Sequence, residues 1–235
     1  MRNNFNLFFK AIIFWFIFLI STISLTPILI LFRVFGYNSA LKIAKLWAYI
    51  TIKSLKYICK IKYVVHGDIK DKSGIIFSKH QSTWETIFFL LIIDNPIYIV
   101  KKELLYIPFF GWCLYLLNNI SIDRTAGRST VRKMVEQTQE SNSKGYTVIL
   151  FPEGTRVAAN DKTKLKQGGL LMIESLNLPV IPITHNAGKF WPRHSFIKFP
   201  GTIEVFIGDA MKLEDKSLND FRKEIELWMD NPRKS

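Results

Sequence analysis

A histidine and a glutamate five residues apart, His80 and Glu85, are the first side chains in this sequence that could perform acid-base chemistry. They lie in the polar stretch 78–86, between an apolar run that predicts a buried strand and another that predicts a helix. Within one continuous helix, residues five apart point to different sides, because each residue turns the helix by about 100°. The two side chains can therefore meet only if a helix begins between them.

The residues in between supply a start signal for that helix. Ser82 is followed three residues later by Glu85, which is the spacing of a capping box with Ser82 as N-cap. His80 then lies just before the helix, where the Glu85 carboxylate can fix its tautomer and stabilise the imidazolium formed when it takes a proton. The alternative is structural: Ser82 and Glu85 merely cap the helix, and His80 is a loop histidine bonded to the backbone.

A second polar stretch follows the short predicted strand 120–122. Its first charged residues are Asp123 and Arg124. One interpretation is an ion pair between these two at the end of the strand. The other is that the planar guanidinium of Arg124 points at a phosphate, to which it can donate two parallel hydrogen bonds.

A third polar stretch, Glu153-Gly154-Thr155-Arg156, follows an apolar strand that ends at Pro152. Gly154 permits a tight turn, and Thr155 and Arg156 add a hydroxyl and a charged fork to the same small loop. Such a loop suits a phosphate monoester. The alternative is an ordinary turn at a sheet edge in which Glu153 pairs with Arg156.

Other kinds of chemistry have little support. Cys59 and Cys113 are isolated cysteines without metal-ligand spacing, so we expect neither a disulfide framework nor a metal site. Ser82 is not presented by a G-x-S-x-G nucleophile motif. The formal charge of +13 over 235 residues indicates an anionic partner, and the hydrophobic content of 49% favours a membrane or lipid phosphate over nucleic acid.

The N-terminal region predicts a membrane anchor. Residues 11–32 contain no charged residue and are bracketed by Lys10 and Arg33, a length that meets the requirement of about 20 apolar residues for a bilayer span. Pro27 lies inside this stretch, so we expect either a kinked span or a helix that turns within the membrane interface.

The next segment, 37–60, predicts a basic amphipathic helix. Its lysines share one helical face when wound at about 100° per residue, and they are Lys42, Lys45, Lys53, Lys56 and Lys60. The rest of its surface is apolar, which is typical of a helix lying on an anionic bilayer. The alternative is a helix packed against the globular domain with its lysines in solvent. Both arrangements can hold at once for a helix wedged between the bilayer and the protein.

From residue 61 onward, short apolar runs alternate with helical stretches. Strands are predicted at 62–65, 74–77, 97–100, 120–122, 146–151, 180–184 and 202–207, and helices at 83–93, 111–117, 129–140, 166–176 and 218–228. This order predicts an α/β fold with a mixed, largely parallel sheet flanked by helices. We therefore expect an N-terminal membrane-associated helical region at 1–60 and an α/β domain at 61–230.

Five blocks of this sequence, in order, resemble the glycerolipid acyltransferase family, and within it the bacterial 1-acyl-sn-glycerol-3-phosphate acyltransferases. The blocks are 80–85 (HQSTWE), 102–112 (KELLYIPFFGW), 122–124 (IDR), 151–156 (FPEGTR) and 180–182 (VIP). The resemblance covers roughly residues 64–208. One departure concerns the acidic residue of the first block, which is usually aspartate in the family and is Glu85 here.

The resemblance implies a catalytic pair, His80 and Glu85, and substrate-binding residues, which would be Ser82, Arg124, Glu153, Gly154, Thr155 and Arg156. In the mechanism that we expect, His80 deprotonates an acceptor hydroxyl, and backbone N–H groups near the helix start stabilise the oxyanion. No cofactor is implied. The acyl donor would be acyl-CoA or acyl-carrier protein, and the acceptor lysophosphatidic acid.

The expected product is phosphatidic acid, made at the cell inner membrane by an active site facing the cytoplasm. Two alternatives stay open. An enzyme of this fold could acylate another lysolipid, either a lysophospholipid in remodelling or a lyso-aminolipid. The chain could instead be a non-catalytic basic module that binds an anionic membrane surface, in which case His80 and Glu85 would be replaceable.

Overall fold

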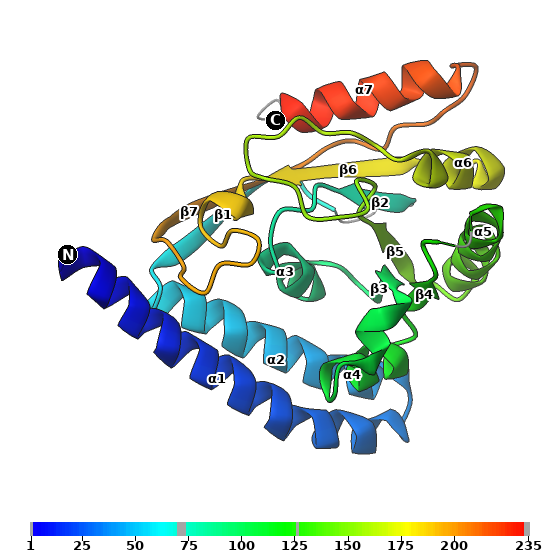
Figure 1. Ribbon diagram of the computed structural model, residues 1–235. Coiled ribbons are helices and arrows are strands. Elements are labelled where there is room, and N and C mark those ends of the chain that lie inside the picture. Colours follow the sequence, from blue (N-terminus) through cyan, green and yellow to red (C-terminus); the bar gives the residue numbers. More distant parts are fainter. Residues whose placement is uncertain (1, 70–73, 126, 233–235) are drawn as a thin grey trace.

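The computed structural model describes residues 2–69, 74–125 and 127–232, and it contains a seven-stranded sheet with helices on both faces (Figure 1). Positions 1, 70–73 and 126 of the two predicted regions lie outside the described residues. Every predicted strand is present, and each observed end is within one residue of the predicted one. The strands are β1 (Ile61–His66), β2 (Ile75–Ser78), β3 (Pro96–Lys101), β4 (Ile120–Ile122), β5 (Thr147–Leu150), β6 (Val180–His185) and β7 (Gly201–Ile207).

The strand order is β1-β7-β6-β2-β5-β3-β4. All neighbouring strands pair in parallel except β6 and β7, which are antiparallel. The predicted mixed, largely parallel sheet is therefore confirmed. Parallel strands are covered on both faces by their crossover helices, which explains why the central strands read as continuous apolar runs. β2, in the middle of the sheet, is buried along its whole length.

The five helices predicted after residue 61 are all present. The helical elements after the first are α2 (Tyr37–Tyr57), α3 (Trp84–Ile92), η1 (Lys102–Tyr106), α4 (Phe110–Leu116), α5 (Arg128–Ser143), α6 (Gln167–Leu176), η2 (Ala187–Lys189) and α7 (Leu218–Asp230).

Successive side chains of a strand point to opposite faces, so β2 contributes side chains to two separate cores. Ile76 lies in the core beneath α2 and α3, whereas Ile75 and Phe77 lie in the core beneath α5, α6 and α7.

The N-terminal helix α1 (Arg2–Arg33) continues through Pro27, and the chain reverses only afterwards, at a turn that ends in Gly36 with φ of 103°. The helix therefore does not end at Pro27, and the choice between a kinked span and a helix that turns within the membrane interface stays a prediction. Among the described residues, the segment Phe5–Arg33 is the one helix long and apolar enough to cross a membrane. Many of its apolar side chains are exposed, including Phe5, Phe16 and Leu31.

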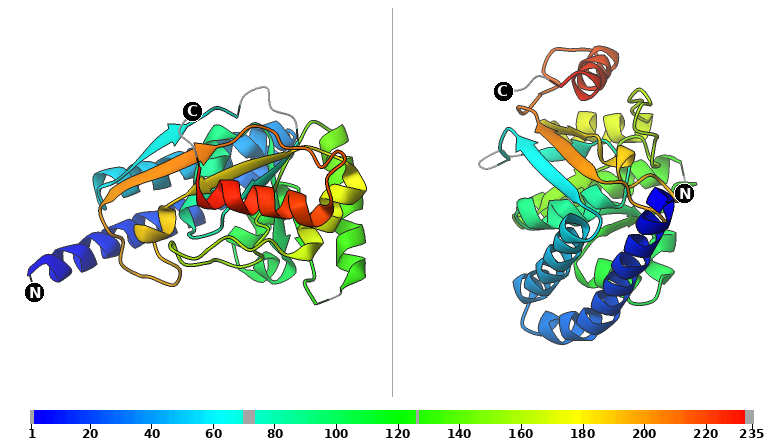
Figure 2. Two further views of the ribbon diagram at one scale, coloured as in Figure 1. Left: turned by 90° about the horizontal axis from the view of Figure 1, so that it is seen from above. Right: turned by 90° about the vertical axis from the view of Figure 1, so that its left-hand side faces the viewer.

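Helix α2 lies beside α1 on one side of the sheet (Figure 2, right). Its residues Leu41, Ile52 and Leu55 are buried in the core that also contains α3. The apolar side of this segment is therefore covered by α1 and the α/β core, as the packed-helix alternative requires, and Lys42 and Lys56 are exposed. Contact of the lysine face with an anionic bilayer stays a prediction, because both arrangements can hold at once.

An aromatic cluster joins α1 to the loop before β7. Lys198 is 1% exposed, and its Nζ lies 3.8 Å from the ring centroid of Trp15 and 4.7 Å from that of Trp191. Trp15 Nε1 donates a hydrogen bond to the Phe196 carbonyl at 3.0 Å. A cation over aromatic faces is attracted by the ring quadrupoles, and the attraction is larger away from water. This cluster fixes the first half of α1 against the α/β domain.

Candidate active site

The polar stretches that follow β2, β4 and β5 meet at the carboxyl ends of these parallel strands (Figure 1). β2 pairs in parallel with β5, β5 with β3, and β3 with β4. The carboxyl ends of parallel strands lie at the same edge, which is where open α/β sheets form their sites. His80, Arg124 and the turn 152–156 therefore lie on neighbouring loops.

His80 contacts Glu85, with Nδ1 2.8 Å from Oε1. The assigned helix α3 begins at Trp84, and Thr83 already has a helical conformation. Ser82 Oγ accepts from the Trp84 N–H at 3.1 Å, and the Ser82 N–H donates to Glu85 Oε1 at 2.8 Å. The predicted capping box is therefore formed in part: Glu85 accepts from the Ser82 N–H, whereas Ser82 Oγ accepts from the N–H of Trp84 rather than of Glu85. This helix start is the local reason why the imidazole and the carboxylate meet.

Glu85 is completely buried. Burial alone would raise the pKa of Glu85, but the nearby His185 and His80 rings and the hydrogen bonds from His80 and the Ser82 N–H lower it. An ionised carboxylate can only accept, so His80 carries its proton on Nδ1. Nε2 of His80 makes no hydrogen bond with the part of the chain that the structure describes. Glu85 therefore orients the imidazole so that Nε2 is the nitrogen that can act as a base.

One expectation for the start of α3 is wrong. Ser82 was expected to bind substrate, but it is 0% exposed and its oxygen caps the helix. Backbone N–H groups near the helix start were expected to stabilise an oxyanion. Those of Gln81 and Ser82 donate to Glu85 Oε1, at 2.9 and 2.8 Å, so these two hold the carboxylate rather than a reacting atom, and a role for other N–H groups of this region stays a prediction.

The turn after β5 holds His80 from the other side. Glu153 Oε2 accepts from the His80 N–H at 2.8 Å, and the Val157 N–H donates to the His80 carbonyl at 2.8 Å. The Phe151 ring stacks on the imidazole, with centroids 4.1 Å apart and an interplanar angle of 21°. The sequence gives no signal for these contacts, since they join residues more than 70 positions apart. Glu153 is 4% exposed and was expected to bind substrate; we now assign it to positioning His80.

The Glu153 carboxyl group also lies in surroundings that disfavour its ionised form. Its Oε1 is buried without a hydrogen-bond partner among the described residues. Burial raises the pKa of the Glu153 carboxyl to about 8, the negative charges of Glu85 and Asp230 add to this effect, and the His80 N–H and Lys79 oppose it. The folded protein therefore favours a protonated Glu153, whereas the unfolded chain ionises it at its ordinary value of 4.5.

Replacing Glu153 with glutamine is expected to stabilise the protein in a pH-dependent way. Because the folded-state pKa is raised, wild-type stability falls as the pH rises from about 4.5 to about 8. Glutamine keeps an acceptor for the His80 N–H but has no proton to lose. The gain in Tm over wild type should grow from almost zero at pH 5 to several degrees at pH 8.5. The corresponding gain in the free energy of unfolding is up to about 4 kcal/mol.

Thermal unfolding in detergent across that pH range measures the effect. Glu174→Gln, which removes an exposed carboxyl on α6, is the matched control and should give a small, pH-independent change. A Tm difference for Glu153→Gln that is the same at every pH would show that the carboxyl is ionised throughout.

Two arginines lie beside this pair. The Arg124 guanidinium donates to the carbonyl of Gly154, which has φ of +70° in the turn after β5. Arg156 is half-buried, and no carboxylate lies within 4.0 Å of it among the described residues. Burial lowers the pKa of Arg156, and the charge of Arg193 adds to this effect while that of Glu85 opposes it. Neither guanidinium has a carboxylate partner among the described residues, and Thr155, which precedes Arg156, is exposed. Guanidinium groups without such a partner suit an anion.

The two ion pairs considered as alternatives do not form. Asp123 pairs with Lys102 and accepts from the Thr125 N–H at 2.9 Å, so it is not the partner of Arg124. Glu153 bonds the His80 backbone rather than Arg156. Both arginines are therefore available to a ligand, as the phosphate interpretation requires.

Lys79, the residue before His80, connects segments that surround the site. It is 5% exposed, and its Nζ donates to the Asp161 carbonyl at 3.0 Å and to Asp230 Oδ1 at 3.1 Å. Asp230 is half-buried at the end of α7, so Lys79 joins the C-terminal helix and the loop after β5 to its own loop after β2. His185 is completely buried and bonds the Lys79 carbonyl at 2.9 Å, which agrees with a structural role.

Comparisons with known proteins agree with this arrangement. The profile of the Acyltransferase family matches residues 60–186. The 1-acyl-sn-glycerol-3-phosphate acyltransferase of Pseudomonas aeruginosa is 39% identical over 188 residues, which are 78% of this chain and 73% of that protein. The enzyme of the same name from Haemophilus influenzae is 28% identical over 54% of this chain, and the match spans only about half, 55%, of its length.

A solved structure shows the same fold. It is the crystal structure of the 1-acyl-sn-glycerophosphate (LPA) acyltransferase, PlsC, from Thermotoga maritima. The match covers 98% of this chain and 95% of that chain, with a TM-score of 0.80 and 24% sequence identity. The matching profile spans His80, Glu85, Arg124 and the turn at Glu153. The profile matches more than half of the chain, and a relative that is 39% identical is covered over most of its length. The chain therefore belongs to the acyltransferase family.

Proposed function

We propose that this acyltransferase moves a fatty acyl group from a thioester donor to the sn-2 hydroxyl of 1-acyl-sn-glycerol 3-phosphate, giving phosphatidic acid. The observation that carries the proposal is the placement of an oriented histidine base, His80 with Glu85, beside two arginines without carboxylate partners. A base can activate an alcohol, and guanidinium groups bind a phosphate monoester. The acceptor named in the titles of the relatives contains both groups.

In the proposed reaction, His80 Nε2 takes the proton of the acceptor hydroxyl as its oxygen attacks the thioester carbonyl carbon. The tetrahedral intermediate then expels the thiolate, breaking the carbon–sulfur bond, and the imidazolium returns its proton to the leaving sulfur. Glu85 stabilises the imidazolium between the two steps. No water and no redox partner is consumed, and the products are the ester and a free thiol.

The substrate's apolar tail indicates where this reaction takes place. Helix α1 exposes large apolar side chains such as Phe9, Phe16 and Leu19. Such a surface is unfavourable in water and suits the acyl region of a bilayer. The exposed lysines of α2 would lie near anionic lipid head groups. We propose that the enzyme is held at the inner membrane with its active site facing the cytoplasm, where thioester donors are made.

Incubating the purified protein with labelled acyl-CoA or acyl-carrier protein and a panel of lysolipids tests the function directly. Identification of phosphatidic acid as the main product supports the proposal. Preferential acylation of another lysophospholipid or of a lyso-aminolipid would assign a different acceptor, and the absence of any lipid product with either donor would refute it.

Replacing Arg156 with alanine is expected to weaken acceptor binding. A charge-assisted hydrogen bond contributes about 1.5 to 3 kcal/mol, so KM for 1-acyl-sn-glycerol 3-phosphate should rise about 10- to 100-fold while kcat changes less. Initial rates at varied acceptor concentration measure this. Arg222→Ala removes the same charge from α7, where the guanidinium bonds Asn219 at 2.9 Å, and should leave KM unchanged. An unchanged KM in Arg156→Ala would remove the residue from the phosphate site.

A further inference from the structure

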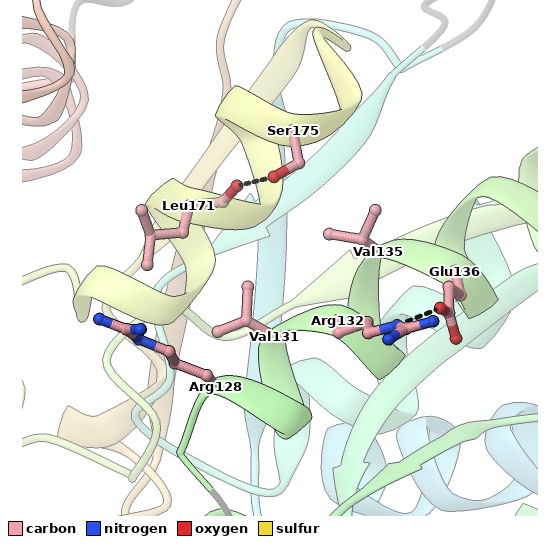
Figure 3. A pocket seen from close by; sticks show the side chains of 7 residues that line it. All are labelled: Arg128, Val131, Arg132, Val135, Glu136, Leu171 and Ser175. Atoms are coloured by element: carbon pink, nitrogen blue, oxygen red, sulfur yellow. Dashed lines mark hydrogen bonds and ion pairs between the residues drawn. The ribbon is translucent and has the colours of Figure 1, made fainter.

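A groove lies between α5 and α6 (Figure 3), and neither His80 nor Glu85 lines it. Its volume is about 460 Å³. Val131 and Val135 of α5 and Leu171 of α6 provide apolar surface, and each is half-buried. The remaining residues around it are Arg128, Arg132, Glu136 and Ser175. Nothing in the proposed reaction uses this groove.

The two ends of the groove differ in charge. At one end, Arg132 Nε bonds Glu136 Oε1 at 2.8 Å, so this guanidinium is already neutralised. Near the same end, Ser175 donates to the Leu171 carbonyl at 2.8 Å. Arg128, at the other end, is exposed and has no ion-pair partner among the described residues (Figure 3). The groove therefore combines apolar walls with one uncompensated positive charge.

The Arg128 end lies toward the catalytic edge of the sheet. Helix α5 follows the carboxyl end of β4, and Arg128 is four residues after Arg124, so their Cα atoms are at most about 14 Å apart. Arg124 bonds the Gly154 carbonyl, and the adjacent Glu153 bonds the His80 N–H. A ligand seated in the groove with an anionic group on Arg128 would thus begin close to the reacting groups.

We propose that this groove binds the adenine nucleotide of a coenzyme A thioester, an inference that rests on the proposed function. The purine lies against Val131, Val135 and Leu171, and a phosphate bonds Arg128. The pantetheine arm, whose backbone is about as long as four extended residues, ~14 Å, runs from there to the histidine. Small-molecule sites typically combine such an apolar concavity with a few placed polar groups.

The groove suits a nucleotide better than the acidic surface of a carrier protein. Its volume matches a single small ligand, whereas a protein surface requires a broad patch of about 800 Å² on each partner. Glu136 borders the far end, and the exposed Glu174 is the neighbour of Ser175 on α6. These carboxylates would repel an acidic protein surface but lie away from a phosphate bound at Arg128.

The test compares Arg128→Glu with Lys133→Glu. Both change the net charge equally on the same exposed helix, but Lys133 does not line the groove. Glutamate at the first position of a helix is favourable for the helix dipole, so Arg128→Glu should fold. Calorimetry with adenosine 3′,5′-bisphosphate should give a Kd about tenfold weaker for Arg128→Glu and within twofold of wild type for Lys133→Glu.

Kinetics provide an independent readout. The ratio of KM for acyl-CoA to KM for S-acyl-pantetheine, which lacks the nucleotide, should rise about tenfold in Arg128→Glu and stay constant in Lys133→Glu. Equal effects of the two substitutions on binding and on this ratio would overturn the inference. So would a wild-type enzyme that accepts acyl-carrier protein but not acyl-CoA.

The same measurements separate this inference from the proposed function. Wild-type acyl transfer from S-acyl-pantetheine without Arg128-dependent nucleotide binding would leave the function standing and refute the groove assignment. Arg128-dependent binding of adenosine 3′,5′-bisphosphate by a protein that acylates no lysolipid would refute the proposed function and support the groove as a nucleotide site.

Discussion

Replacing His80 with alanine should lower kcat by about 10² to 10⁴, the usual contribution of a positioned general base. Glu85 accepts from the imidazole Nδ1 at 2.8 Å and thereby orients Nε2 to act as the base in the proposed reaction. Thiol release at saturating donor and acceptor measures the loss. KM for both substrates should change little, because in the proposed complex the arginines, rather than His80, bind the phosphate.

The fold and membrane binding should survive this substitution. His80 is half-buried, and its backbone bonds to Glu153 and Val157 do not depend on the side chain. Circular dichroism and vesicle flotation check both properties. His66→Ala is the matched control, because His66 pairs with Glu204 on β1 and β7, away from the site. If His80→Ala keeps near-normal turnover, some other group is the base.

The contact between His80 and Glu85 could be predicted because it is set by local sequence. The capping-box spacing fixes where α3 begins, and the helix start fixes which side chains converge. The convergence of the arginines could also be predicted, since it follows from the parallel order of strands whose apolar runs are continuous. In each case, a short-range pattern determines the geometry.

The roles of Glu153 and Lys79 could not be predicted, because their partners lie far away in the sequence. Glu153 is 73 positions from His80, and Lys79 is 151 positions from Asp230. Composition suggests that an acidic or basic residue in a polar stretch is solvated or faces a ligand. Burial reverses that expectation, because a buried charge must be paired or neutralised by the protein itself. The position of these loops relative to one another determines which outcome occurs.

The same reasoning explains α2. Its lysine face is visible in the sequence and is found at the surface, but the partner of its apolar face is not encoded locally. Burial of Leu41 and Leu55 by α1 and α3 requires knowledge of how the hairpin docks on the sheet. An amphipathic pattern indicates that a face is covered, without specifying whether protein or lipid covers it.

Replacing Glu85 with glutamine should lower kcat by on the order of 10² to 10⁴, close to the effect of removing the base itself. The N–H groups of Gln81 and Ser82 need an acceptor, so the amide oxygen should stay where Oε1 is and the amide nitrogen should replace Oε2. His80 then keeps its tautomer but loses the negative charge that stabilises its imidazolium. Saturating thiol-release kinetics should show the loss in kcat, with KM for the acceptor nearly unchanged.

Glu85→Asp separates this electrostatic role from a structural one. Aspartate is the residue that the family's motif usually has here, and it restores the charge while shortening the side chain by one methylene. Turnover should recover to within about tenfold of wild type in Glu85→Asp, because most of a base's contribution depends on the charged partner. If Glu85 served only to cap α3, glutamine, which can still accept from Ser82, should instead be the milder replacement. A glutamine variant more active than the aspartate variant would therefore reject the charge-stabilising role and, with it, the proton transfer proposed for His80.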